Sequence, residues 1–311
     1  MNRNELKKLI LGPIATVPTP FDSEYHVDYG RMYDLTKWWV ANGVVKGRAV
    51  IKVAAAMGEG FMLRDDEWPA LLRTVVNAAD GKAAIVHGLH YKDTLRTIED
   101  AKRAQDLGAI GLQISPPIMS HPTQDDILRH YEAISKAIDI GIMIYHTHWW
   151  PGGRIEVDTF MKMADFEQVV AIKWGVPKDM KYEDMTKFAH IFNVIENGPN
   201  PVRCHKLGGR GFINETLAAY QPHDLNVWDL LEAKKYDEAQ ALWDSVTIKL
   251  YDYYTRHSNW RSNGEARVVK GLMKIMGQDV GDSRPPTLPL DDAELADLRN
   301  LVKSWGWPVK G

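Results

Sequence analysis

Short apolar runs alternate with amphipathic stretches between residue 12 and about residue 213. A continuous apolar run is typical of a parallel strand, because helices cover both faces of such a strand. The pattern predicts eight strands, at residues 14–17, 48–54, 83–87, 111–115, 140–145, 169–173, 192–196 and 211–214. Eight strands that alternate with helices predict a (β/α)8 TIM barrel rather than a two-domain doubly wound sheet.

Helical periodicity is clearest between residues 94 and 107. The apolar residues there recur at three- and four-residue spacing and end before Gly108; they are Leu95, Ile98, Ala101, Ala104 and Leu107. Another helix is expected to begin near the acidic run of residues 65–67, because negative charge is favoured at a helix N-terminus.

The pattern changes after Pro222, where residues 224–306 show helical periodicity only. One apolar stripe comprises Ala239, Leu242, Trp243, Val246, Leu250, Tyr253 and Tyr254. Prolines interrupt the chain before a last helix, which we expect at about residues 291–305. We therefore predict a barrel that carries the active site at residues 1–222, followed by a C-terminal helical extension at residues 223–311.

Bulk composition narrows the classes of function. The net charge is -3 and no basic block is present, so nucleic acid or an anionic membrane is not an expected partner. The first residues show no signal peptide or membrane span, and the single cysteine, Cys204, is expected to be a packed thiol in a reducing cytoplasm. A dinucleotide fingerprint is missing after the first strand, and we expect no cofactor.

Two strand endings carry the chemistry. Tyr145 ends one apolar run and Lys173 ends the next. Catalytic groups of a barrel enzyme lie where its strands end, and neighbouring strands are about 4.8 Å apart. A buried lysine loses its proton more easily and becomes a nucleophile, while a nearby phenol can carry protons. The pair therefore predicts Schiff-base chemistry.

Motifs along almost the whole chain resemble the dihydrodipicolinate synthase/N-acetylneuraminate lyase family of class I aldolases. The spacing of Tyr145 and Lys173 fits that family. The other matching motifs are Pro18-Thr19-Pro20-Phe21, Gly58-Glu59 with Leu63 and Glu67, Pro117 and Pro122, Gly211-Phe212-Ile213-Asn214, Val269-Lys270-Gly271-Leu272-Met273 and Pro286-Thr287-Leu288-Pro289-Leu290.

This resemblance implies a barrel followed by helices, assembled as a homotetramer (a dimer of dimers). It also implies that Lys173 condenses with the carbonyl of a 2-oxo acid such as pyruvate, and that Tyr145 shuttles protons. The expected activity is that of a lyase, either an aldolase or a hydratase-aldolase or dehydratase, and an aldehyde is the expected second substrate.

The chain departs from its relatives after the second strand. The family usually carries Gly-Thr-Thr-Gly-Glu there, whereas this chain has Ala55-Ala56-Met57-Gly58-Glu59. Both hydroxyl groups of the family's proton relay are therefore missing. We expect Ala56, Met57 and Gly58 to bind the substrate carboxylate through backbone N–H groups, which any side chain leaves in place. We expect Glu59 to be structural.

Two further loops also differ. The family's Pro-Tyr-Tyr is replaced by Pro117-Ile118-Met119, and the loop after Tyr145 runs through His146, His148, Trp149, Trp150 and Arg154. The resemblance implies that Arg154 grips the carboxylate of a second substrate. Ile213 and Asn214 are expected to line the site, as the corresponding segment does in relatives.

These changes exchange hydroxyl groups for apolar surface. The apolar residues are Met57, Ile118, Met119, Trp149, Trp150 and Trp174. Such a site suits a bulky or aromatic carbonyl substrate, because aromatic rings bury large areas against one another. The alternative is that these tryptophans pack at a subunit interface or beneath the loop. His146 and His148 are candidates to replace the missing relay, since imidazole titrates near neutral pH.

Two other classes of protein compete with the lyase. One is a metal-dependent hydrolase that uses His146 and His148, with His87 and His90 as further ligands, although such hydrolases carry His-x-His on the first strand. The other is a barrel that binds carbonyl ligands without catalysis. The presence of both Lys173 and Tyr145 favours the enzyme, and we expect no metal.

Overall fold

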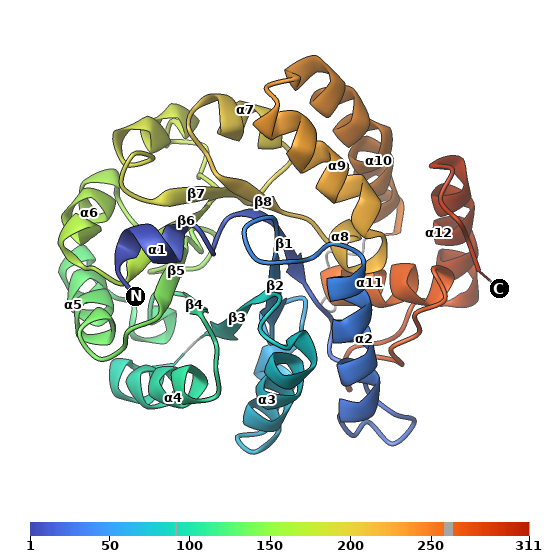
Figure 1. Ribbon diagram of the computed structural model, residues 1–311, viewed down its shortest axis with the longest axis horizontal. Coiled ribbons are helices and arrows are strands. Elements are labelled where there is room, and N and C mark those ends of the chain that lie inside the picture. Colours follow the sequence, from blue (N-terminus) through green and yellow to red (C-terminus); the bar gives the residue numbers. More distant parts are fainter. Residues whose placement is uncertain (91, 258–263, 311) are drawn as a thin grey trace.

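The computed structural model describes residues 1–90, 92–257 and 264–310. Eight parallel strands form a closed barrel in the order β1 to β8, and the helices form a ring around it (Figure 1). The strands are β1 Gly12–Thr16, β2 Val50–Val53, β3 Ala84–Leu89, β4 Gly111–Ile114, β5 Gly141–Tyr145, β6 Val169–Trp174, β7 Asn193–Glu196 and β8 Gly211–Ile213. The predicted fold class and all eight predicted strands are confirmed.

The second and third strands differ from their predicted bounds for a steric reason. Strand β2 ends at Val53 because Ala54 adopts a positive φ of 54° and turns the chain. Strand β3 continues to Leu89, and its Gly88 lies directly beneath that turn. A Cβ atom on Gly88 would lie 2.7 Å from the carbonyl oxygen of Ala54, so only glycine lets the two segments approach this closely.

Helices follow most of the strands. They are α2 Tyr29–Ala41, α3 Glu67–Ala79, α4 Thr94–Asp106, α5 Gln124–Ser135, α6 Val157–Lys162, α7 Pro201–Lys206 and α8 Thr216–Ala219, while α1 Arg3–Lys7 precedes β1. Short 3₁₀ turns occur at η1 Gly60–Met62, η2 Ile118–Ser120, η3 Met163–Asp165 and η4 Tyr182–Lys187. Helix α4 begins where predicted, because Asp93 accepts hydrogen bonds from the N–H groups of Leu95 and Arg96.

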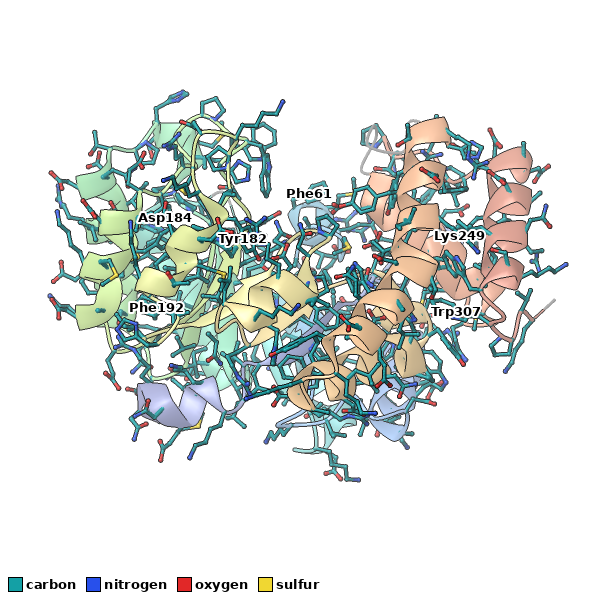
Figure 2. The ribbon with its side chains drawn as sticks, turned by 90° about the horizontal axis from the view of Figure 1, so that it is seen from above. Phe61, Tyr182, Asp184, Phe192, Lys249 and Trp307 are labelled. Atoms are coloured by element: carbon teal, nitrogen blue, oxygen red, sulfur yellow. The ribbon has the colours of Figure 1, made fainter. Side chains whose placement is uncertain are left out.

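The C-terminal region is helical, as predicted. It comprises α9 Gln221–Glu232, α10 Tyr236–His257, α11 Gly264–Ile275 and α12 Asp292–Ser304. These helices lie together on one side of the barrel (Figure 1). Figure 2 shows Tyr182 and Phe192 on the barrel side, Lys249 and Trp307 on the helical side, and Phe61 between them. Helix α9 runs across residue 222, so the division of the chain at that residue stays a prediction.

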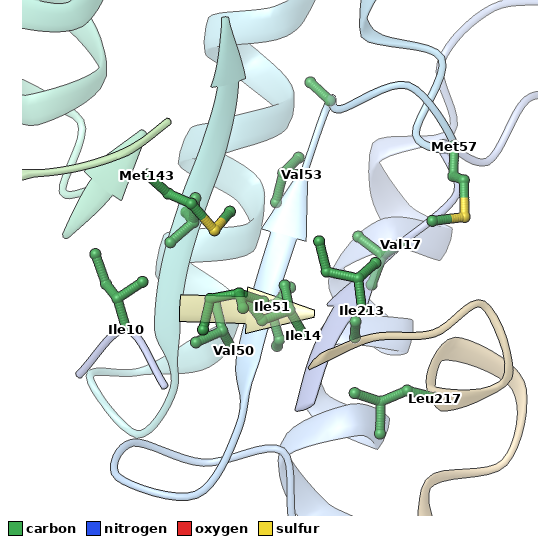
Figure 3. Close-up of a cluster of buried hydrophobic side chains, with 14 of the residues drawn as sticks. Ile10, Ile14, Val17, Val50, Ile51, Val53, Met57, Met143, Ile213 and Leu217 are labelled. Carbon is green, nitrogen blue, oxygen red and sulfur yellow. The ribbon is translucent and has the colours of Figure 1, made fainter. Parts of the chain in front are cut away.

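Buried apolar side chains fill both the barrel interior and the space beneath the helices. Ile14 of β1, Val53 of β2 and Ile213 of β8 belong to this core (Figure 3). Every residue of every strand is buried, which explains why the strands have continuous apolar runs in the sequence.

Strand register places two lysines in one interior layer. Lys52 pairs with Val86 and Val86 with Gly111, while Gln113 pairs with Met143 and Met143 with Ala171. In an eight-stranded barrel the strands are tilted, and side chains from every second strand form one layer across the interior. From one of these strands to the next, the residue in the layer lies two positions further along than the register partner. Following this rule around the barrel returns to the starting residue. The residues of this layer, which we call the interior lysine layer, are Lys52, Gln113, Lys173 and Ile213.

A buried ion pair attaches α11 to the barrel. The Nζ atom of Lys270 lies 3.0 Å from Oε2 of Glu59 and donates to the carbonyl oxygens of Thr19 and Asp282. Both side chains are almost completely buried. The pair therefore connects the loop after β2 to the C-terminal helices.

Replacement of Lys270 by methionine is expected to lower the free energy of unfolding by about 3–5 kcal/mol, because the carboxylate of Glu59 would remain buried without its partner. Chemical denaturation of wild type and variant measures this difference. The double variant with Glu59→Gln should recover part of the loss. A loss below about 1 kcal/mol would show that the pair behaves like an exposed one.

Candidate active site

Lys173 and Tyr145 lie side by side at the C-terminal ends of β6 and β5. They are register partners, and the Nζ atom of Lys173 lies 3.9 Å from the centre of the Tyr145 ring. Both side chains are buried, with 5% and 7% of their surface exposed. The two strand endings thus meet as the sequence predicts, at the edge where barrel enzymes place their chemistry.

Burial controls the protonation of the Lys173 amine. Desolvation lowers the pKa of Lys173 to about 8, and the charge of Glu265 on α11 partly opposes this shift. A pKa of about 8 leaves roughly a tenth of the amine neutral at pH 7, compared with less than a thousandth for an exposed lysine. The amine is therefore prepared for attack on a carbonyl carbon.

A series of polar side chains also leads to Tyr145. None of them was expected to take part in the lyase chemistry. Lys52 donates to Oε1 of Gln113 at 2.7 Å, and Nε2 of Gln113 lies 3.2 Å from Nε2 of His90. The His90 ring meets the Tyr145 ring edge to face, with centroids 5.4 Å apart. The sequence did contain an indication of this series, since Lys52 and Gln113 are polar residues inside otherwise apolar strands.

The donor and acceptor roles in this series follow from the hydrogen bond between Lys52 and Gln113. Lys52 donates to Gln113, and the Gln113 atom that accepts this bond is the carbonyl oxygen. The amide nitrogen of Gln113 then donates to Nε2 of His90, which places the hydrogen of the neutral ring on Nδ1. Burial and the charges of Lys173 and Lys52 lower the pKa of His90 to about 3. The ring is therefore neutral near pH 7.

The loop after β2 is a tight turn that exposes backbone donors. Residues Ala54 and Glu59 have positive φ angles, and the hydroxyl of Thr19 donates to the carbonyl oxygen of Gly58 at 2.7 Å. Within the described ranges, no acceptor takes the N–H groups of Met57 and Gly58. This geometry fits the expectation that the turn receives a carboxylate, although Ala56 and Met57 contribute no polar side chain.

Aromatic surface borders Tyr145 on its exposed side. The Trp149 ring meets the Tyr145 ring edge to face at 5.6 Å, and 48% of Trp149 is exposed. Trp150 is equally exposed, and Met119 is 78% exposed. His148 lies between Trp149 and His146.

Two expected site residues point away from Lys173. The Trp174 ring packs against Phe160 and Phe188 on the outer side of the barrel, and its indole N–H donates to the carbonyl oxygen of Tyr182. His146 stacks on Trp174 with ring centroids 5.7 Å apart. Successive residues of a strand face opposite sides, so the inward direction of Tyr145 and Lys173 turns their next neighbours outward. These contacts favour the alternative in which Trp174 packs beneath the loop, and a catalytic role for His146 stays a prediction.

Arg154 is held by acidic groups of its own chain. It forms ion pairs with Glu156 at 2.7 Å and with Asp179 at 2.6 Å. The predicted grip on a substrate carboxylate would compete with these two acidic partners for the guanidinium group. Sequence alone did not reveal this competition, because Asp179 lies 25 residues further along the chain.

Ile213 and Asn214 lie where β8 ends. Ile213 belongs to the interior lysine layer, while the side-chain amide of Asn214 donates to Asp224 at 2.8 Å. Both residues and Met57 line a cavity of about 70 Å³ beneath α10, together with Glu215, Tyr254 and Glu265. Burial raises the pKa of Glu215 to about 7.

The remaining candidate residues have structural surroundings. Glu59 is fully buried and pairs with Lys270, in agreement with its predicted structural role. Cys204 is also fully buried, and burial raises the pKa of its thiol, as expected for a packed cysteine.

The competing metal hypothesis gains no support from side-chain positions. His87 packs against Trp68, while the His90 ring faces Tyr145. In the part of the chain that the structure describes, no three His, Cys, Asp or Glu side chains are grouped to hold a metal ion. Among the same residues, none of the helices combines the length and apolar character needed to cross a membrane.

Comparison with known proteins agrees with this geometry. Residues 10–305 match the model of the dihydrodipicolinate synthetase family. The chain is 27% identical to the 4-hydroxy-tetrahydrodipicolinate synthase of Heliobacterium modesticaldum, over 94% of this chain and 95% of that protein. It is 24% identical to a probable 5-dehydro-4-deoxyglucarate dehydratase of Rhizobium rhizogenes, over 98% and 99% of the two chains.

A solved structure gives the same fold. The dihydrodipicolinate synthase from Acinetobacter baumannii, crystallised with pyruvate, superposes with a TM-score of 0.84 and 24% identity, over 96% of this chain and 99% of that one. The family model covers nearly the whole chain. This protein therefore belongs to the dihydrodipicolinate synthetase family and is an enzyme of its Schiff-base lyase type.

Proposed function

We propose that Lys173 forms an imine with a 2-oxo acid and that Tyr145 moves protons during the reaction. The observation that carries this proposal is the desolvated Nζ atom of Lys173, 3.9 Å from the centre of the Tyr145 ring at the ends of neighbouring barrel strands. A non-catalytic barrel would gain nothing from burying an amine in this way, because burial makes the charged form costly.

The chemistry follows from the neutral amine. Its lone pair attacks the carbonyl carbon, the oxygen takes up protons and leaves as water, and a cationic iminium remains on Lys173. The iminium withdraws electrons, so a C–C or C–O bond one carbon further along the substrate can break or form. The Tyr145 hydroxyl accepts and returns the protons that these steps release. Aldol cleavage and loss of water share this intermediate.

The second substrate is an aldehyde with a bulky or aromatic group. The half-exposed Trp149 ring supports this proposal, because it stands against Tyr145 and offers a flat apolar face next to the reacting centre. Trp150 and Met119 extend the apolar surface. Assembly as a dimer of dimers also stays a prediction for this chain.

Replacement of Lys173 by alanine is expected to abolish the mass increase that pyruvate and borohydride produce in the wild type. Tyr145→Phe should still form the adduct but lower kcat by about 10²–10⁴-fold, because only the proton carrier is lost. Tyr131→Phe is the matched control, since it removes a buried hydroxyl that donates to the carbonyl oxygen of Ile114. An adduct that persists without Lys173 would contradict the assignment.

The rate of adduct formation should rise with pH through about 8 and then level off. Lys173 is protonated below its pKa of about 8 and neutral above it, so the reactive form accumulates as the pH rises. The measurement is the rate of pyruvate trapping between pH 6 and 10.5, followed by mass spectrometry. A midpoint at the ordinary lysine value would show that the amine is not desolvated.

Trp149→Ala is expected to lower kcat/KM for an aromatic aldehyde by about tenfold and to affect a short aliphatic aldehyde much less, because the lost ring contact contributes about 0.5–1.5 kcal/mol. Tyr33→Ala is the control, since that ring is also exposed but belongs to α2. Equal losses for both aldehydes would rule out the aromatic preference.

A further inference from the structure

Lys52 is a buried amine without an anionic partner, and burial and the charge of Lys173 lower the pKa of Lys52 well below the usual lysine value. Its side chain is fully buried in β2, and its Nζ atom donates to the neutral amide of Gln113. Of the residues that the structure describes, none brings a carboxylate within 4.0 Å of this atom. Glu265 acts on Lys52 through its charge but forms no ion pair with it. A buried ammonium group of this kind is costly unless an anion approaches it.

The position of Lys52 indicates which anion that is. In the interior lysine layer the order of strands is β2, β4, β6 and β8, so Lys52 of β2 faces Lys173 of β6 across the barrel axis. The charge of Lys173 acts directly on Lys52, which agrees with this placement. Each of the two amines disfavours the charged form of the other, and an anion held between them would favour the ammonium form of Lys52.

A 2-oxo acid bound to Lys173 would supply such an anion. The carbon that bonds to the Lys173 nitrogen in the imine also carries the carboxylate, so the negative charge is only two bonds from that nitrogen. The loop after β2, which continues from the strand of Lys52, offers the N–H groups of Met57 and Gly58 to the same carboxylate. An approaching carboxylate would favour the ammonium form of Lys52, and this group and the two backbone donors would together hold it.

We propose that Lys52 is a specificity-determining residue that binds the carboxylate of the 2-oxo acid held by Lys173. The proposal rests on the imine function proposed for Lys173. It assigns to this site a preference for ionised 2-oxo acids over neutral ketones of the same shape. Lys52 takes no part in bond making, since the nucleophile is Lys173.

The test compares pyruvate with methyl pyruvate, which has the same carbonyl but no charge. Each probe is titrated against the full chain with cyanoborohydride, and intact mass gives the concentration that labels half of the protein. In the Lys52→Met variant, the half-labelling concentration of pyruvate relative to that of methyl pyruvate should rise about 10- to 100-fold, the range expected for a lost charged hydrogen bond. Lys249→Met, an exposed lysine on α10, is the control.

The possible outcomes separate this proposal from the function on which it rests. If wild type traps neither probe at Lys173, the imine function fails and the proposal with it. If wild type traps both probes and Lys52→Met leaves their ratio unchanged, the carboxylate role is overturned while the imine function stands. Lys52→Gln, which keeps a polar group beside Gln113, gives the same comparison if the methionine variant does not fold.

Discussion

Desolvation of amines inside the barrel is the constraint on which the site depends. Every residue of the eight strands is buried, and Lys52 and Lys173 expose only 0% and 5% of their surface. An ammonium group is poorly tolerated there, so protonation becomes sensitive to the few charges nearby. The same burial that closes the barrel therefore lowers the pKa of Lys173 to about 8 and produces a nucleophile.

The polar groups around this nucleophile have fixed orientations. Gln113 accepts a hydrogen bond from Lys52 and donates one to His90, and the His90 ring contacts the Tyr145 ring edge to face. Each contact determines the next, since the carbonyl oxygen of Gln113 accepts from Lys52 and leaves the amide nitrogen to donate. The site therefore retains an ordered network although the hydroxyl groups typical of the family are missing. Its members come from strands β2 to β6 and are brought together only when the barrel closes.

The sequence predicted the strands well because a parallel barrel requires both faces of each strand to be apolar. The bounds of β2 and β3 escaped prediction, since they depend on the close contact of Gly88 with Ala54. The outward direction of Trp174 follows from the alternation of strand residues, because its neighbour Lys173 faces inward. Use of this rule requires knowing which strand residue faces inward, and only the assembled barrel shows this.

Other parts of the site could be predicted only from strand register and long-range contacts. Lys52 appeared in the sequence as one charge in an apolar run, and its position opposite Lys173 follows only from pairing around the whole barrel. The ion pairs of Arg154 join residues on different loops, so resemblance to a family motif did not reveal that its charge is already engaged.

The most direct test of the account is to locate the covalent adduct by peptide mass spectrometry after pyruvate and borohydride treatment of the wild-type chain. Both buried lysines of the interior layer are candidates by burial alone, but only Lys173 stands over Tyr145. We predict that the added mass is found on the peptide containing Lys173 and not on the peptide containing Lys52. An adduct on Lys52, or on neither peptide, would contradict the account.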